Sequence, residues 1–268
     1  FGSIIIGAMK SSWSRKKARR DANGIVTKRK KNRRGSFSFM GGLQTLTNAL
    51  STKLGEESLK LHSSVLSLSC NLHGNPPHSN WSINYVRNGH KQPVKEESFD
   101  AVIMTAPLCK FREIQISKNG KPFLLDFLPM VTYLPMSIII TTFKKQDVKR
   151  PLEGFGILVP SKEEKNGFQT LGTIFSSSMF PDRAPSDQYL FTTLIGGSRN
   201  KNLAKSSLKE LQEVAVKDLN RLLGIENHPL AVKHVYWSEA FPLYSLDYNL
   251  VLDAIDKMEK NLPGLYFA

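Results

Sequence analysis

The chemically reactive side chains of this chain form no recognisable catalytic set. Its two cysteines, Cys70 and Cys109, make no disulfide framework, and its six histidines show no metal-ligand spacing. No glycine-rich dinucleotide fingerprint, P-loop or nucleophile elbow occurs, and the scattered acids form no evident pair. We therefore expect no metal site and assign no catalytic residue. A bound cofactor is expected to carry the chemistry, while an apolar sheet serves as a wall for the substrate.

Two short apolar runs, at residues 99–107 and 262–268, predict where a cofactor would bind. Residues 102–104 are apolar without alternation, so both faces of this strand are expected to be covered, as in a central strand of a parallel sheet. Such sheets bind ligands beyond the carboxyl ends of their strands. The first run reaches that edge at Thr105-Ala106-Pro107, and the second reaches it at Ala268. We expect an internal fragment of a nucleotide-cofactor protein, with part of the cofactor site outside it.

The net charge of +14 is concentrated in one segment. Residues 10–34 hold twelve Lys and Arg but a single acid, Asp21, which leaves the remaining residues at 14 − 11 = +3. Few apolar residues occur there, so we predict a mobile, solvated loop. It is also typical of a nuclear-localisation or phosphate-binding run, but Trp13 is its only aromatic residue, so nucleic acid is not an expected partner.

The hydrophobic pattern predicts mixed α/β structure in four parts. These are a helix tail and basic loop at 1–34, part of a cofactor domain at 35–115, an antiparallel-sheet domain at 116–229, and a return to the cofactor domain at 230–268. The antiparallel strands are apolar on both faces in places, which is typical of a sheet that borders an apolar ligand pocket. No apolar run approaches the roughly 18 residues that span a bilayer.

The predicted elements follow from periodicity and from capping and turn residues. Helices are expected at 41–54, 206–223 (with a Ser207–Glu210 capping box) and 248–260, and turns at Asn88-Gly89 and 241–244. Strands are expected at 37–39, 59–61, 65–72, 81–86, 99–105, 136–143, 154–159, 170–177, 188–195, 232–237 and 265–268.

A series of blocks in a fixed order carries a family resemblance: residues 34–46, 99–108, 151–160, 171–183, 196–200, 236–242 and 262–268. Together they resemble the plant protoporphyrinogen oxidases of the mitochondrial type, within the flavin amine-oxidase-like superfamily. The resemblance implies part of an FAD-binding Rossmann-like domain joined to an antiparallel-sheet substrate-binding domain. It also implies that the family's glycine-rich fingerprint and most of its membrane-associating region precede residue 1.

The activity implied by the resemblance is FAD-dependent oxidation of protoporphyrinogen IX to protoporphyrin IX, with molecular oxygen as acceptor, in heme and chlorophyll biosynthesis. This piece alone is expected to be inactive. The implied location is the mitochondrion, at the inner membrane, or alternatively the chloroplast, and a homodimer is compatible with the resemblance.

The resemblance also implies roles for single residues near the flavin. Val65 corresponds to a valine whose backbone meets the adenine, and Ala268 to the alanine that starts a flavin-closing turn. Trp237 corresponds to a position that borders the flavin. An ordinary strand valine and a packed core tryptophan are the alternatives for the first and the last.

Leu158, Ile174 and Leu194 correspond to positions that line the tetrapyrrole pocket on three successive strands, although all three could be plain core. Position 194 is often Phe in plant relatives, so Leu194 keeps an apolar wall but loses a ring able to stack on a pyrrole. Two other functions stay open: a flavin-dependent amine or polyamine oxidase, and a non-enzymatic basic module that binds nucleic acid or lipid through residues 10–34.

Overall fold

The computed structural model describes residues 38–73, 78–87 and 94–268. The predictions for the basic segment 10–34, for Phe37 and for the turn at Asn88-Gly89 lie outside the described residues. The chain divides into two compact units, Phe1–Lys60 and Leu61–Ala268.

In the first unit, the described residues form helix α2 (Gln44–Leu54) and the short 3-10 helix η1 (Glu56–Ser58). The helix predicted at 41–54 begins later because Gly42, with φ of 84°, closes a turn and donates its N–H to the carbonyl of Phe39 at 2.9 Å. That turn also makes the predicted strand wrong at residues 38 and 39. The strand predicted at 59–61 is wrong as well, because His62 takes φ of 55° in a turn that precedes the next strand.

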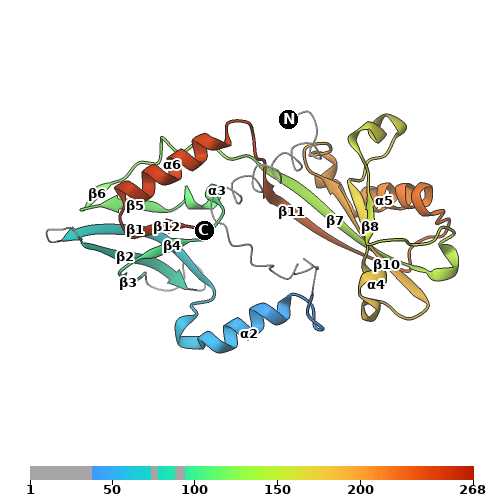
Figure 1. Ribbon diagram of the computed structural model, residues 1–268, viewed down its shortest axis with the longest axis horizontal. Coiled ribbons are helices and arrows are strands. Elements are labelled where there is room, and N and C mark those ends of the chain that lie inside the picture. The colour runs from blue at the N-terminus through green and yellow to red at the C-terminus, as the bar shows by residue number, and fades with distance from the viewer. Residues whose placement is uncertain (1–37, 74–77, 88–93) are drawn as a thin grey trace, which may run out of the picture. The chain divides into compact units, whose positions relative to one another are not determined.

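The second unit contains a five-stranded mixed sheet of order β3-β2-β1-β5-β6 and a parallel pair, β12-β4 (Figure 1). In the mixed sheet, β1 pairs antiparallel with β2 and parallel with β5. The bounds are β1 Ser63–His73, β2 His78–Arg87, β3 Lys95–Phe99, β5 Gln115–Lys118 and β6 Lys121–Pro122. Those of the parallel pair and the nearby helices are β4 Val102–Met104, β12 Leu265–Phe267, α3 Leu108–Phe111 and α6 Tyr248–Asn261.

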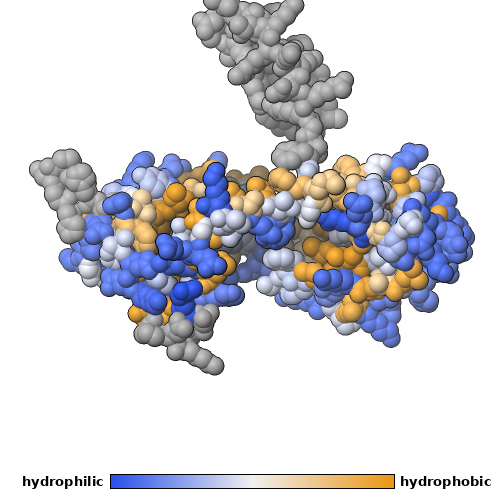
Figure 2. Space-filling model, turned by 90° about the horizontal axis from the view of Figure 1, so that it is seen from below, coloured by the Kyte–Doolittle hydropathy of each residue, from blue (hydrophilic) through white to orange (hydrophobic). Residues whose placement is uncertain are grey.

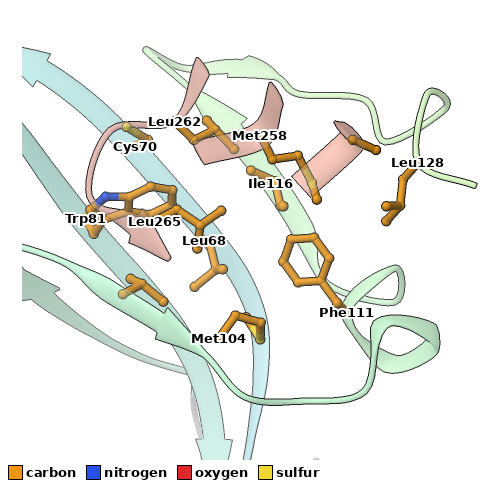
Figure 3. Close-up of a cluster of buried hydrophobic side chains, with 12 residues drawn as sticks. Leu68, Cys70, Trp81, Met104, Phe111, Ile116, Leu128, Met258, Leu262 and Leu265 are labelled. Atoms are coloured by element: carbon orange, nitrogen blue, oxygen red, sulfur yellow. The ribbon is translucent and has the colours of Figure 1, made fainter. Parts of the chain in front are cut away.

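One buried cluster joins these two sheets to helix α6, as Figure 3 shows. Trp81 belongs to it and is fully buried, and its indole N–H donates to the carbonyl of Pro263 at 3.0 Å, just before β12. The expectation that both faces of β4 are covered is wrong. Val102 and Met104 point into the cluster, but Ile103 between them is 67% exposed. Among the described residues, β4 pairs with β12 alone.

An antiparallel sheet of order β11-β7-β10-β9-β8 completes the second unit (Figure 1). Strands β8 and β9 are shorter than predicted, and β9 ends early because the chain turns into α4 directly after Phe175. Strand β11 runs through the predicted turn at 241–244 as far as Pro242, which is tolerated because β11 is an edge strand. The bounds are β7 Tyr133–Lys144, β8 Gly156–Leu158, β9 Gly172–Phe175, α4 Ser176–Met179, β10 Gln188–Gly196 and β11 Ala231–Pro242.

Helix α5 (Leu208–Leu223) covers one face of this antiparallel sheet. The predicted capping box is confirmed: the N–H of Glu210 donates to the Ser207 hydroxyl, and the Ser207 N–H donates to the Glu210 carboxylate. Leu211, Ala215 and Leu219 of the helix are buried against the sheet. Short 3-10 helices link the strands: η2 Lys145–Asp147, η3 Ser161–Asn166, η4 Pro181–Arg183 and η5 Leu203–Lys205.

None of the described helices combines the length and the apolar character needed to cross a bilayer. Figure 2 shows one side of the molecule, where orange apolar surface alternates with blue hydrophilic surface. Several large apolar side chains of the second unit are therefore accessible, and two groups of them are relevant to function.

Candidate functional site

The structure brings the three predicted substrate residues onto one face of the antiparallel sheet. Leu158 and Leu194 both pair with Gly172, so the two leucines flank that glycine in a single row across β8, β9 and β10. Ile174 lies two residues along β9 and therefore points to the same side. Leu158 is 81% exposed, Ile174 is 36% exposed, and Leu194 is half-buried. The plain-core alternative therefore fits Leu158 poorly.

Three further apolar side chains extend this surface across the other two strands. Ile138 of β7 lies between Leu194 and Val235 in the same row, and Ile140 lies opposite Thr192 in the next row. We call this side of the sheet the open face, made up of Leu158, Ile174, Leu194, Ile138, Ile140 and Val235. Sequence reasoning missed the last three, although the alternation along β7 indicates which of its residues share a face.

Two glycines make the open face flat between these side chains. Gly172 lies between Leu158 and Leu194, and Gly156 pairs with Ile174 in the neighbouring row. A Cβ atom on Gly156 would come within 2.3 Å of the Thr173 carbonyl oxygen, and one on Gly172 within 2.4 Å of the Ile157 oxygen. Any larger residue would therefore push β8 and β9 apart. The close approach of the strands requires glycine at both positions and leaves no side chain at Gly172 of β9 or at Gly156 of the edge strand β8.

The opposite face of the same strands is closed. Phe175, Phe191 and Ile195 are buried beneath α5, and the hydroxyls of Thr173 and Thr193 lie 3.0 Å apart in the buried layer. Alternation along each strand thus separates a packed side from an accessible apolar side. The accessible side is the one that carries the predicted substrate residues.

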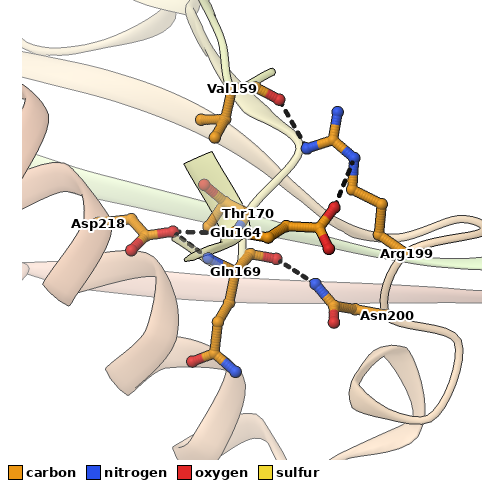
Figure 4. A network of polar contacts seen from close by, with 7 residues as sticks. All are labelled: Val159, Glu164, Gln169, Thr170, Arg199, Asn200 and Asp218. Carbon is orange, nitrogen blue, oxygen red and sulfur yellow. Dashed lines mark hydrogen bonds and ion pairs between the residues drawn. The ribbon is translucent and has the colours of Figure 1, made fainter. Parts of the chain in front are cut away.

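A polar network fixes the connection between β8 and β9 (Figure 4). The buried carboxylate of Asp218 on α5 accepts hydrogen bonds from the N–H groups of Gln169 and Thr170 at 3.0 and 2.9 Å. From the other side, Arg199 donates to the carbonyl of Val159 at 2.6 Å, directly after Leu158. The side-chain amide of Asn200 donates to the Gln169 carbonyl at 2.9 Å, and Arg199 also pairs with Glu164. Hydrogen bonds therefore fix both ends of the connection between β8 and β9, the two strands that provide Leu158 and Ile174.

A cavity of about 520 Å³ opens beyond the carboxyl ends of β4 and β12. Its size lies within the range of small-molecule and cofactor sites. Thr105, Ala106 and Pro107 line it together with Ala268, whose N–H donates to the Met104 carbonyl at 3.1 Å. This is the edge where the sequence predicts a cofactor. Its other walls come from β11 and α6, including Glu239, Tyr244, Tyr248 and Leu252.

Tyr133 fixes one wall of this cavity. Its hydroxyl accepts a hydrogen bond from the Leu108 N–H at 3.2 Å, at the start of α3. Burial raises the pKa of the Tyr133 hydroxyl, so it stays protonated at neutral pH. Burial likewise raises the pKa of both cysteine thiols, which are therefore poor nucleophiles. Among the described residues, no group of three His, Cys, Asp or Glu side chains could hold a metal ion.

The other two predicted cofactor residues do not line that cavity. Trp237 is 55% exposed on β11 and precedes a break in strand register, whereas the cavity is lined by residues that follow the break. Val65 is 41% exposed on β1 and pairs with Tyr85 of β2. The next residue, Leu66, forms a bulge and has no partner in the ladder with β2. A bulge leaves backbone groups without ladder partners, which suits recognition by main-chain atoms.

Comparison with known proteins decides the family. Residues 17–268 match the family model described as "Flavin containing amine oxidoreductase". The chain belongs to the flavin-containing amine oxidoreductases. Within this family it is 56% identical over all 268 residues to "Protoporphyrinogen oxidase, mitochondrial" of Nicotiana tabacum, and covers 53% of that protein. It is 52% identical over the same length to "Protoporphyrinogen oxidase 2, chloroplastic/mitochondrial" of Arabidopsis thaliana, and covers 52% of it. The chain thus spans about half the length of the curated relatives it matches.

Solved structures of this flavoprotein family and its neighbours share the fold. A crystal structure from Exiguobacterium sp. 255-15, whose name proposes a protoporphyrinogen oxidase, aligns with a TM-score of 0.66 at 19% identity, covering 86% of this chain and 46% of that one. Cyclohexylamine oxidase from Brevibacterium oxydans aligns with a TM-score of 0.56 at 10% identity, covering 85% and 46%. At these identities the likeness establishes fold alone. It confirms the predicted mixed α/β, amine-oxidase-like architecture.

Proposed function

We propose that this chain is the substrate-wall portion of an FAD-dependent enzyme that oxidises protoporphyrinogen IX to protoporphyrin IX with molecular oxygen. The observation that carries the proposal is the open face of the antiparallel sheet. It is wide, apolar and accessible, and it is flattened by Gly156 and Gly172. A tetrapyrrole is a large, flat and mostly apolar ring system. The names of the two plant relatives support the same substrate.

The roles of the wall residues follow from their positions. Leu158, Ile174 and Leu194 would contact one side of the macrocycle, and Ile138, Ile140 and Val235 would extend that contact. Burial of their apolar surface favours binding at roughly 25 cal/mol per Å² removed from water. It also excludes water from the substrate, so the wall binds and orients the macrocycle without itself moving protons.

The cavity at the ends of β4 and β12 supports an FAD site. Its volume, its mainly apolar walls and the backbone at Thr105, Ala106 and Ala268 suit a flavin ring system. Ala268 would hold the ring, the bulge beside Val65 would meet the adenine, and Trp237, outside the walls of this cavity, would border the flavin. A bound FAD would supply the redox chemistry, as the hydride acceptor for the substrate with oxygen as the final acceptor and hydrogen peroxide as the by-product.

The cellular setting is proposed from the relatives. Their names place them in mitochondria, or in chloroplasts and mitochondria, so we place this protein in the mitochondrion, at the inner membrane, with the chloroplast as the alternative. Contact with the membrane surface and a homodimer complete the proposal. No observation on the described residues favours the amine-oxidase alternative over protoporphyrinogen oxidation.

The test uses a full-length graft, in which this chain replaces the matching segment of the tobacco mitochondrial relative. Flavin absorbance and porphyrin fluorescence are measured after adding protoporphyrinogen IX. Leu158→Asp should raise KM for protoporphyrinogen by about tenfold or more, because a carboxylate on the open face would lose hydration against an apolar ring. Leu230→Asp is the matched control, since Leu230 is 51% exposed and lies outside the open face. Peroxide formed with putrescine, and none with protoporphyrinogen, would favour an amine oxidase instead.

A further inference from the structure

A charged side chain, Lys233, lies beside the apolar residues of the open face, on the edge strand β11 of the antiparallel sheet. Lys233 of β11 pairs directly with Ile140 of β7, and Ile140 pairs with Thr192 of β10. Side chains at paired positions project to the same side of a sheet. Lys233 therefore shares the open face with Ile174 and Leu194, whereas its neighbour His234 points to the other side and contacts the hydroxyl of Ser137 at 2.8 Å.

Lys233 has no structural task that would explain its position. It is exposed, and no ion pair or hydrogen bond joins its ammonium group to another of the described residues. An alkyl side chain would extend the apolar surface of the row better than a lysine does. The ammonium group is therefore available to a ligand that lies on the open face.

We propose that Lys233 binds a carboxylate of the substrate and thereby sets the orientation of the macrocycle on the open face. This inference rests on the proposed function, since a porphyrinogen carries propionate side chains at one side of an otherwise apolar ring. Apolar contacts alone would allow the ring to turn in its own plane. A cation at one edge of the wall removes that freedom, because only some rotations bring a propionate to it.

The distances fit this role. Neighbouring strands lie roughly 4.8 Å apart, so about 14 Å separates the backbone at Lys233 from that at Ile174, three strands away. A macrocycle centred over β10 would project its propionates across part of that span. The four-carbon stem of Lys233 can lie along Ile140 and carry the ammonium group toward them while its methylenes stay on apolar surface.

Lys144 provides a matched comparison on the same face. It lies at the end of β7, paired with Gln188, and points to the same side as Ile138 and Ile140. Six residues separate it from Ile138, or roughly 20 Å along an extended strand. Lys144 is exposed, like Lys233, but is too far from the leucine row to reach a macrocycle bound there.

The experiment compares Lys233→Met, Lys233→Arg and Lys144→Met in the full-length graft. Binding of protoporphyrin IX and of its dimethyl ester, which has no free carboxylate, is measured by fluorescence quenching, and KM is measured with protoporphyrinogen IX. Lys233→Met should weaken binding of the free acid about three- to tenfold and raise KM by a similar factor. Binding of the ester should stay unchanged. Lys233→Arg should restore most of the affinity, and Lys144→Met should have no effect.

Equal losses for acid and ester in Lys233→Met would overturn the assignment, because they would indicate a change in packing rather than a lost ion pair. Unchanged affinity for the acid would overturn it too. If the unmodified graft neither binds the porphyrin nor oxidises protoporphyrinogen, the proposed function itself fails. That result is distinct from a working graft in which Lys233 has no role.

Discussion

Removing the Asp218 carboxylate should destabilise the second unit by about 3 kcal/mol. The Asp218 carboxylate accepts a hydrogen bond from the buried N–H of Thr170. The loss of this charge-assisted bond costs about 2 kcal/mol, because the N–H is left unpaired away from water. Gln169 is exposed, so its N–H can form a hydrogen bond with water when the carboxylate is removed. The loss of this second bond therefore costs only about 1 kcal/mol. Asp218→Ala removes both bonds. Asp218→Asn keeps a neutral acceptor of the same shape and should cost about 1 kcal/mol.

Urea unfolding followed by tryptophan fluorescence measures these differences in the free energy of unfolding. Glu213→Gln on the same helix is the control, since Glu213 is exposed and a surface substitution of this kind should change stability by less than about 0.5 kcal/mol. A loss below about 1 kcal/mol for Asp218→Ala would refute the reasoning, as would a loss as large in the control. Because the bonds hold the segment leading into β9, Asp218→Asn should also raise KM for a ligand bound on the open face.

Three further predictions concern the core, a helix end and the open face. Trp81→Phe should cost about 2–4 kcal/mol of unfolding free energy, because it leaves a gap and an unpaired carbonyl in the buried cluster that joins the mixed sheet, the parallel pair and α6. Ser207→Ala should cost about 1 kcal/mol at pH 7 by removing the helix cap. Hydrogen bonds from Ser207 lower the pKa of Glu210 from its ordinary value, so the carboxylate's contribution is present above the ordinary pKa and is lost as the pH falls through the lowered one. A stability–pH profile should therefore be flatter in acid for the variant. Gly172→Ala would bring its Cβ within 2.4 Å of the Ile157 oxygen and should weaken porphyrin binding in a titration while leaving flavin absorbance unchanged.

Local signals in the sequence were sufficient for the elements that depend on local interactions. The capping box at Ser207 and the apolar stripe that follows it predict α5 correctly, because both act within a few residues of each other. The wrong predictions had two causes. Local turns with positive φ at Gly42 and His62 displaced the elements expected around them, whereas other errors depended on distant partners. The turn expected around Phe241 is part of β11 because β7 supplies a pairing strand more than a hundred residues earlier in the chain.

The candidate site shows the same division. The family resemblance implies that Leu158, Ile174 and Leu194 are apolar wall positions, but their common row depends on the register of three strands. Nothing in the sequence indicates that register, so Ile140 and Lys233 could not be placed beside them. Long-range register also explains why Trp237 and Ala268, expected at one cofactor, do not line a common cavity among the described residues.

The two faces of the antiparallel sheet differ in shape, so they suit different packing partners. Helix α5 packs on a face built from Phe175, Phe191 and Ile195, whose bulky side chains leave grooves for the ridges of a helix. The open face has glycine at Gly172 of β9 and at Gly156 of the edge strand β8, so over this part of the face a helix would find no side chains to interlock with. A rigid planar ring needs no such grooves, and its binding improves as the surface becomes flatter. The arrangement of small and large residues therefore argues for a flat ligand over a further packing element, and the Gly172→Ala titration tests that distinction directly.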